Sequence, residues 1–264
     1  MENFAYHTPA SVADAAKFLE AHEDAKLMSG GMTLLPTLKQ RLAAPTDLID
    51  LAKVPDIKGV CRDGDELVIG AMTTHADVHE NALVRELIPG LASLAGQIGD
   101  PAVRHRGTIG GSCANADPAA DYPAGTVGLG ATFVTNKRKI AADDFFVGLF
   151  ETALEPSEII VGVRFPIPVW SHYQKLRHPA SGYAVVGVFV AQTKAGVRVA
   201  VTGAGPSAFR ISAMEEALAK DFSAKAIENI KVDAGDLNND IHASADYRAH
   251  VVTVLAKRAV AAKG

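Results

Sequence analysis

The sequence is poor in cysteine, with only Cys61 and Cys113 among its 264 residues. A cysteine-ligated iron–sulfur cluster usually needs four thiolates, and a structural zinc site needs spaced cysteine and histidine sets that are missing here. The chain therefore cannot hold an ordinary cysteine-ligated cluster by itself. We expect a cytoplasmic protein, in which thiols are kept reduced, and hence no disulfide.

Long apolar runs and clusters of positive charge are missing as well. No run approaches the roughly 20 apolar residues of a membrane span, and residues 1–4 are not followed by the apolar core of a signal peptide. The net charge is −4, and the most basic stretch, residues 136–139, is short and lies between apolar runs. This stretch predicts a hairpin turn with solvated charges and argues against nucleic-acid binding.

Apolar residues make up 48% of the chain, enough to bury the core of one large domain or two small ones. Strand-like and helix-like patterns alternate without a fixed repeat, which predicts an α+β fold. Pro166-Ile167-Pro168 is the expected domain boundary, because its two prolines favour an extended linker. We therefore expect a domain over residues 1–168, with subdomains of about 1–55 and 56–168, and a second domain over residues 169–264.

Capping and turn residues mark several local elements. Ser11 is the expected N-cap of a helix, with Asp14 as its capping-box partner. Residues 62–65 and 194–196 are typical of hairpin turns. We also expect helices within residues 74–96, a glycine-rich loop over residues 99–121, and a C-terminal helix over residues 244–263.

Two motifs combine paired glycines with hydroxyl residues, Ser-Gly-Gly-Met-Thr-Leu-Leu at 29–35 and Gly-Thr-Ile-Gly-Gly-Ser at 107–112. Glycine lets the backbone reach positive φ and approach a ligand closely. Successive N–H groups can then point at one anion, and a helix that starts after the loop adds its own free N–H groups. The motifs favour a diphosphate site; the alternative is two ordinary tight turns. The Rossmann and P-loop patterns are absent, which argues against those nucleotide sites.

Residues 107–121, Gly-Thr-Ile-Gly-Gly-Ser-Cys-Ala-Asn-Ala-Asp-Pro-Ala-Ala-Asp, resemble the second FAD loop of the molybdenum hydroxylase flavoproteins. These include the medium subunits of aerobic carbon monoxide dehydrogenase and the FAD domains of xanthine dehydrogenase. Residues 29–36 resemble the first FAD loop, and residues 173–177 and the helix containing Tyr247-Arg248 agree as well. The resemblance covers nearly the whole chain. It implies two α+β subdomains of the PCMH/MurB-like type that clasp FAD, followed by a smaller domain with an antiparallel sheet and helices.

The resemblance also implies a division of labour between chains. A large partner would carry the molybdenum cofactor and oxidise the substrate, and a small partner would carry two iron–sulfur clusters. This chain would take electrons from those clusters and pass them to an external acceptor, in a dimer of heterotrimers. Two alternatives remain open, a self-contained FAD-dependent oxidoreductase of MurB-like type and an assembly protein that has lost FAD.

Positions that match the family's FAD contacts occur in both motifs and outside them. Met32 and Ser112 depart from the family pattern, so their individual contacts are open. The implied contacts are Leu27, Met28, Ser29, Gly30, Gly31, Met32, Thr33, Leu34, His75, Ile98, Thr108, Ile109, Gly110, Gly111, Ser112, Asp121, Ile160 and Lys175.

Two of these residues have expected chemical roles. Lys175 would act on the flavin, because a cation near N1 stabilises the reduced ring and raises its potential; the alternative is a solvated lysine on a strand. Asp121 would accept a hydrogen bond from a ribityl or ribose hydroxyl, or would be a helix N-cap.

Other candidates have simpler explanations. His75 and His79 have the spacing of two metal ligands on one helix, but no further ligands accompany them, so we expect surface histidines and no metal site. The stretch from Gly110 to Ala114 loosely resembles a nucleophile elbow but lacks its last glycine. We expect no hydrolase, and we expect Cys113 to be a small buried apolar residue.

Overall fold

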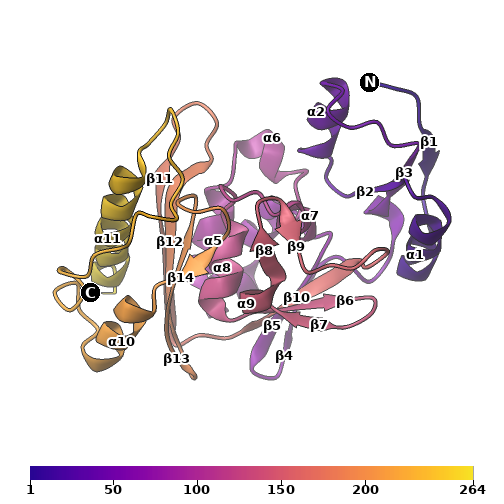
Figure 1. The fold of residues 1–264 in the computed structure, drawn as a ribbon. Coiled ribbons are helices and arrows are strands. Elements are labelled where there is room, and N and C mark those ends of the chain that lie inside the picture. Colours follow the sequence, from indigo (N-terminus) through magenta and orange to yellow (C-terminus); the bar gives the residue numbers. More distant parts are fainter. Residues whose placement is uncertain (264) are drawn as a thin grey trace.

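The computed structural model describes residues 1–263 (Figure 1). The N-terminal part forms a three-stranded sheet of order β1-β3-β2 in which both strand pairs are parallel. The Ser11 hydroxyl accepts from the Asp14 N–H at 3.0 Å and so caps the first helix, as the sequence predicts. The elements are β1 (Ala5–His7), α1 (Val12–Ala21), β2 (Lys26–Met28), α2 (Leu34–Lys39), β3 (Asp47–Asp50) and the 3-10 helix η1 (Leu51–Lys53).

The central part contains a five-stranded antiparallel sheet of order β4-β5-β10-β6-β7. The predicted turns at residues 62–65 and 136–139 join neighbouring strands of this sheet. The elements are β4 (Val60–Asp63), β5 (Glu66–Gly70), α3 (His75–Glu80), α4 (Ala82–Leu87), α5 (Pro89–Gly96), α6 (Pro101–Arg104), α7 (Ile109–Asn115), α8 (Tyr122–Leu129), β6 (Thr132–Thr135), β7 (Lys139–Ala141), α9 (Ala142–Phe145), β8 (Phe146–Gly148), β9 (Glu151–Thr152) and β10 (Ile160–Pro166).

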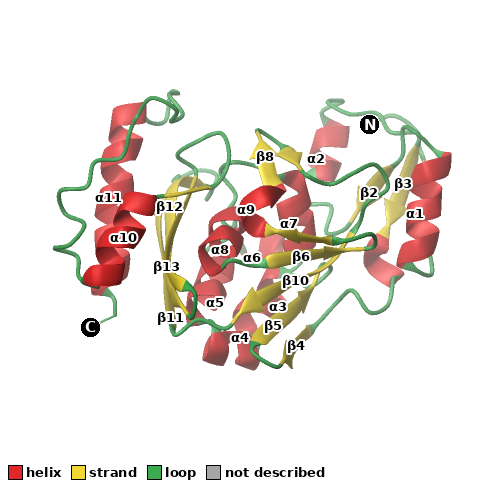
Figure 2. Cartoon of the chain, turned by 60° about the horizontal axis from the view of Figure 1, so that its bottom comes forward, coloured by secondary structure: helices red, strands yellow, loops and turns green. Residues whose placement is uncertain are grey.

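The C-terminal part is a four-stranded antiparallel sheet, β11 to β14 in chain order, with helices on both faces (Figure 2). Helices α10 and α11 cover one face, and α5 and α8 of the central part cover the other. The elements are β11 (Trp170–Arg177), β12 (Ala184–Thr193), β13 (Gly196–Thr202), β14 (Phe209–Arg210), α10 (Ser212–Lys220) and α11 (Ala245–Ala261). The fold is therefore mixed α and β, as expected.

One hydrophobic core joins the C-terminal sheet to the central part. Tyr173, Phe189, Ala191 and Ala200 of the sheet belong to the same buried cluster as residues of α5 and α8. The opposite face of the sheet buries a separate cluster against α10 and α11. The chain passes from β10 to β11 through residues 167–169, and the division into domains at this point stays a prediction.

The glycine-rich stretch 99–121 is not the loop that the sequence predicts. It contains α6 and α7, and Gly110 and Gly111 lie in the first turn of α7. The Thr108 hydroxyl caps this helix by accepting from the Gly111 N–H at 3.1 Å. The second motif therefore begins a helix instead of preceding one, because a hydroxyl N-cap supplies the partner that the first turn needs.

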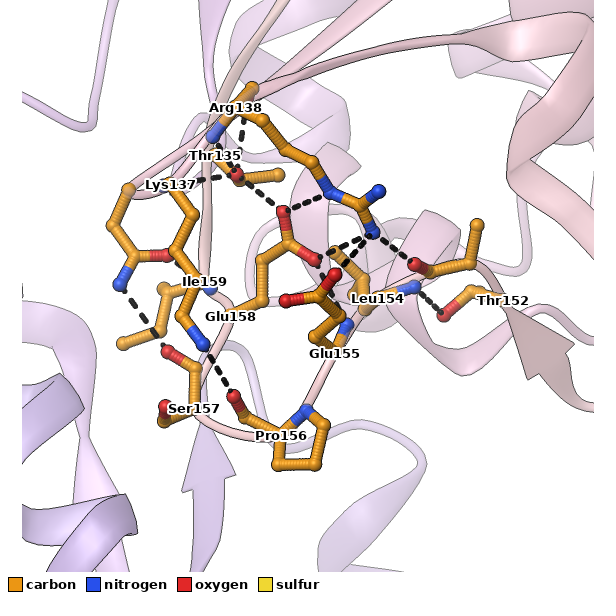
Figure 3. A network of polar contacts seen from close by, with 12 residues as sticks. Thr135, Lys137, Arg138, Thr152, Leu154, Glu155, Pro156, Ser157, Glu158 and Ile159 are labelled. Atoms are coloured by element: carbon orange, nitrogen blue, oxygen red, sulfur yellow. Dashed lines mark hydrogen bonds and ion pairs between the residues drawn. The ribbon is translucent and has the colours of Figure 1, made fainter.

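The turn at residues 136–139 is confirmed, but its charges are not simply solvated. Lys137 donates to the Pro156 carbonyl, and Arg138 forms an ion pair with Glu158, whose side chain is fully buried (Figure 3). The sequence could not indicate this pairing, because the two partners of Arg138 and Lys137 lie about 20 residues further along the chain.

The two histidines at metal-ligand spacing are also not surface residues. His75 is 4% exposed, and His79 is half-buried with Nδ1 2.8 Å from the Ala92 carbonyl oxygen. No group of three or more potential metal-ligating side chains occurs within residues 1–263. In the same part of the chain, no helix is both long enough and apolar enough to span a bilayer.

Candidate functional site

Both glycine motifs line one cavity of about 650 Å³. Its walls come from the β2–α2 connection, α7 and the residues before it, residues 150–160, and residues 181–183 between β11 and β12. A second cavity, of about 520 Å³, lies between α1 and the β6–β7 turn and contains neither motif. The first cavity is in the size range of cofactor sites and combines apolar walls with a few polar groups.

The first motif offers free main-chain donors to this cavity. Gly30, Gly31, Met32 and Thr33 line it, and within the described chain none of their N–H groups donates a hydrogen bond. Gly31 has φ of 72°, a left-handed conformation that favours glycine and turns the chain into α2. Four successive N–H groups without protein partners form the kind of concave donor set that binds a phosphate.

The second motif does not offer such donors, contrary to the expectation. The Ile109 N–H donates to the Thr73 carbonyl at 3.1 Å, and the Gly110 N–H donates to the Ala71 carbonyl at 2.9 Å. The next two N–H groups are satisfied by Thr108, through its hydroxyl and its carbonyl oxygen. Within the described chain, the Thr108 N–H is the one backbone donor of this motif without a protein acceptor. The second motif therefore contributes mainly shape and hydroxyl groups.

Close contact between the two motifs explains Gly30 and Gly111 better than backbone freedom does. A Cβ on Gly30 would lie 2.0 Å from the Arg106 carbonyl oxygen, and a Cβ on Gly111 would lie 2.4 Å from Ser29 Oγ. The Thr108 hydroxyl also donates to Ser29 Oγ at 3.1 Å. Glycine at these positions lets a loop of the N-terminal part touch the start of α7, which closes the cavity on one side.

His75 is a buried polar group beside the cavity. It begins α3, its N–H donates to the Gly107 carbonyl at 2.9 Å, and its Nδ1 has no hydrogen-bond partner among the described residues. Burial, with a smaller contribution from the nearby Arg104 charge, lowers the pKa of His75 to about 4. The ring is therefore neutral at physiological pH and keeps an unused hydrogen-bonding atom.

Asp121 and Lys175 form a buried ion pair at another edge of the cavity. Lys175 Nζ donates to Asp121 Oδ2 at 2.9 Å and to the Gln97 carbonyl at 3.2 Å, and the Tyr173 hydroxyl donates to Asp121 Oδ1. Asp121 precedes α8 without capping it through its side chain. Lys175 is thus not a solvated lysine, and both carboxylate oxygens of Asp121 already have protein donors.

The cavity brings together most of the residues implied by the resemblance. Met28, Ile109 and Lys175 do not line it, and Ile109 is fully buried in the core. The implied residues that do line it are Leu27, Ser29, Gly30, Gly31, Met32, Thr33, Leu34, His75, Ile98, Thr108, Gly110, Gly111, Ser112, Asp121 and Ile160.

The cavity also has walls that sequence reasoning missed. Tyr183 and Asp117 line it; burial raises the pKa of each, and for Tyr183 the charges of Asp117 and Asp121 add to the effect. Asp117 lies inside the 107–121 motif, so its position could have been noticed. Phe150 carried no local signal, because its place in the wall depends on tertiary contacts.

Comparison with known proteins gives the class. Residues 2–168 match the family model described as the FAD binding domain in molybdopterin dehydrogenase. The chain therefore belongs to the FAD-binding subunits of the molybdenum hydroxylases and is an oxidoreductase subunit, which confirms the resemblance.

Particular relatives are medium chains of such enzymes. The carbon monoxide dehydrogenase medium chain of Hydrogenophaga pseudoflava is 35% identical over 275 residues, covering 97% of this chain and 96% of its own. The nicotine 6-hydroxylase medium subunit of Paenarthrobacter nicotinovorans is 34% identical, over 98% and 96% of the two chains. A solved carbon monoxide dehydrogenase from Hydrogenophaga pseudoflava, which lacks the Mo-pyranopterin moiety, contains a chain that matches with a TM-score of 0.89 and 36% identity, over 99% of this chain and 97% of its own.

Proposed function

We propose that this chain binds FAD in the 650 Å³ cavity and relays electrons from iron–sulfur clusters of a small partner to an external acceptor. A large partner with the molybdenum cofactor would oxidise the substrate, in a cytoplasmic dimer of heterotrimers. Family membership favours this function over a self-contained MurB-like oxidoreductase, and the medium-chain relatives support the partners.

The observation that carries the proposal is the run of free N–H groups from Gly30 to Thr33. A diphosphate held there would receive main-chain hydrogen bonds without a lysine or arginine. The unused Nδ1 of His75 and the absence of Cβ atoms at Gly30 and Gly111 further fit a large polar cofactor lying against the backbone. The residues present therefore fit FAD.

Bound FAD would supply redox chemistry in which electrons are taken up singly and passed on in pairs. The protein residues would bind and orient it. The amides of the first motif would hold the diphosphate, and the polar edge formed by Asp121 and Tyr183 would lie at another part of the same cavity. The proposed FAD contacts are the implied residues that line the cavity, with Lys175 acting through Asp121.

The division of labour between chains is supported by what this chain lacks. With two cysteines, one of them buried, it has too few thiolates for a cysteine-ligated cluster. The clusters would therefore lie in the small partner and the molybdenum cofactor in the large one. The substrate of the large partner and the acceptor of this chain would be identified from the purified complex.

Cofactor titration tests the binding step. The full chain, freed of flavin, is titrated with FAD and separately with FMN, and flavin fluorescence is recorded. We expect FAD to bind at least about 100-fold more tightly, because FMN lacks the diphosphate bridge. Equal binding of the two flavins, or no binding of FAD, would contradict the proposal.

A complex without FAD tests the electron-transfer step. The complex is purified from the native host with metal and flavin analysis, and FAD is then removed. We expect the substrate still to reduce the iron–sulfur clusters, seen by electron paramagnetic resonance, while reduction of the acceptor stops until FAD is restored. Undiminished acceptor reduction without FAD would exclude the relay.

A further inference from the structure

The cavity wall between residues 150 and 160 has little regular structure of its own. β9 covers two of these residues, and β10 begins only at Ile160. Phe150 and Ser157 have left-handed φ values of 54° and 58°, which residues with a Cβ adopt only where surrounding contacts hold them. The residues of this wall that line the cavity are Phe150, Leu154, Glu158, Ile159 and Ile160.

The β6–β7 turn is hydrogen-bonded to this wall (Figure 3). Side chains at three successive positions of the turn, 136 to 138, bond to the backbone of residues 153–159. The contacts are Asn136 Nδ2 to the Ser157 carbonyl at 3.2 Å, the Ile159 N–H to Asn136 Oδ1 at 2.8 Å, Lys137 Nζ to the Pro156 carbonyl at 2.8 Å, and an Arg138 guanidinium N–H to the Ala153 carbonyl at 2.7 Å.

Glu158 is the centre of this network. Its carboxylate accepts from the Thr135 hydroxyl at 2.7 Å, from two Arg138 nitrogens at 3.0 and 3.1 Å, and from the Glu155 N–H at 2.8 Å. Four donors use the acceptor positions of one carboxylate. Burial acts to raise the pKa of Glu158, but Arg138 and the other donors outweigh it and lower the pKa to about 2. Glu158 therefore has no free acceptor position for a ligand, although it borders the cavity.

The residues after Glu158 connect the two parts of the chain that supply the glycine motifs. Ile159 is buried in the core of the N-terminal part, while Ile160 belongs to the core of the central part. The Ser157 hydroxyl also donates to Glu20 of α1 at 3.1 Å. Residues 157–160 therefore join the N-terminal part to the central part beside the cavity.

We propose that Arg138 and Glu158 are positioning residues for the cofactor. The ion pair between them holds residues 150–160 as a fixed wall of the cavity and thereby sets the affinity for FAD. The inference rests on the proposed function. Neither residue touches the cofactor's reacting atoms in this assignment. Removing Arg138 leaves the buried Glu158 carboxylate without its cation, which is costly, so the wall rearranges to reach water.

Arg164 provides a control away from the cavity. It lies on β10 in the same sheet and forms ion pairs with Asp63 and Glu66 at 2.6 and 2.7 Å, but it does not line the cavity. Arg138→Met removes the cation from a buried carboxylate of the cavity wall, and Arg164→Met removes one from more exposed carboxylates away from the cavity. The melting temperature therefore has to be compared alongside the affinity, because the buried pair contributes more to stability. The full chain is freed of flavin and titrated with FAD, and the visible circular dichroism of bound flavin and the melting temperature without flavin are recorded.

We expect Arg138→Met to raise the dissociation constant for FAD about tenfold or more and to change the dichroism of bound flavin. Arg138→Lys, which keeps the charge without the two-pronged contact, should lie between Arg138→Met and the unmodified chain. Arg164→Met should bind FAD within about twofold of the unmodified chain. Lys137→Met, which removes one exposed contact to the wall, should weaken FAD binding by a smaller factor and keeps the test open if Arg138→Met does not fold.

The outcomes separate this inference from the proposed function. If the unmodified chain binds no FAD, the proposed function itself fails. If it binds FAD while Arg138→Met and Lys137→Met bind it equally well, or if Arg164→Met loses as much affinity as Arg138→Met, the positioning role is wrong and the ion pair only stabilises the fold.

Discussion

Lys175 Nζ lies 2.9 Å from Asp121 Oδ2, and the two side chains are only 1% and 4% exposed. Burial raises the pKa of Asp121 and lowers that of Lys175, while the attraction between them opposes both shifts. The pair connects β11 of the C-terminal sheet to the residue before α8. Each partner is therefore a costly buried charge without the other.

Removing one partner of this pair should destabilise the protein more than removing both. We expect Lys175→Met to lower the free energy of unfolding by about 3–5 kcal/mol, because it leaves Asp121 buried and unpaired. The double variant Lys175→Met/Asp121→Asn should recover much of this loss. Denaturant unfolding at neutral pH measures both, and simple additivity of the two single substitutions would contradict the coupling.

Redox titration of the same variant tests the expected role of Lys175 toward the flavin. Loss of the cation should lower the reduction potential of bound FAD, because a nearby positive charge favours the reduced ring. Asp121→Asn is the control, since it removes the opposite charge. A potential that is unchanged in Lys175→Met would remove Lys175 from this role.

The contact between the two glycine motifs predicts the effect of a single methyl group. Gly111→Ala would place Cβ 2.4 Å from Ser29 Oγ and 3.0 Å from Thr108 Oγ1, so it should push the motifs apart and weaken FAD binding about tenfold or more. Ser29→Ala in the same chain should restore part of the affinity by removing the nearer atom. Ser29→Ala alone should bind FAD like the unmodified chain. If the double variant then binds FAD no better than Gly111→Ala, the motifs are not coupled through this contact.

His75 should make stability depend on pH in mildly acidic solution. Its pKa is lowered from 6.5 to about 4 in the folded chain, so the unfolded chain binds more protons between these values and stability falls as the pH drops through them. From pH 8 to 5 the loss should be about 2 kcal/mol. Denaturant unfolding at the two pH values should show this loss in the unmodified chain and in His250→Gln, an exposed control, and a clearly smaller loss in His75→Gln.

The two cysteines should differ sharply in reactivity. Cys61 is exposed, whereas Cys113 is buried and burial strongly raises the pKa of its thiol. A thiol reagent at neutral pH should therefore label one group per folded chain, and a second only after unfolding. Labelling of Cys113 in the folded protein would mean that α7 opens readily.

Local elements could be predicted where a few neighbouring residues determine them. The Ser11 cap, the hairpin turns and the C-terminal helix depend on short-range hydrogen bonds or on apolar spacing, and the structure contains them. The second glycine motif predicts a loop because glycine pairs usually mark turns, but it forms a helix that depends on the Thr108 cap and on packing against Ala71. Packing against distant residues is not readable from local sequence.

The candidate site was predictable as a set of residues but not as a chemical surface. Most of the residues implied by the resemblance line the cavity, yet the sequence does not reveal that the amides of Ile109 and Gly110 are occupied by Thr73 and Ala71. It also does not reveal that Lys175 is paired with Asp121, 54 positions away. These contacts are set by tertiary structure, which decides which donors are left for a ligand.

The core shared by the C-terminal sheet and helices α5 and α8 limits how this protein can be engineered. The family match ends at residue 168, but Tyr173 and Phe189 beyond it fill the same buried cluster. A chimaera that transplants residues 2–168 alone would expose apolar side chains of this shared core to water on both fragments. Grafting onto a foreign enzyme would therefore have to transfer residues 2–168 together with the sheet of β11 to β14 as one unit.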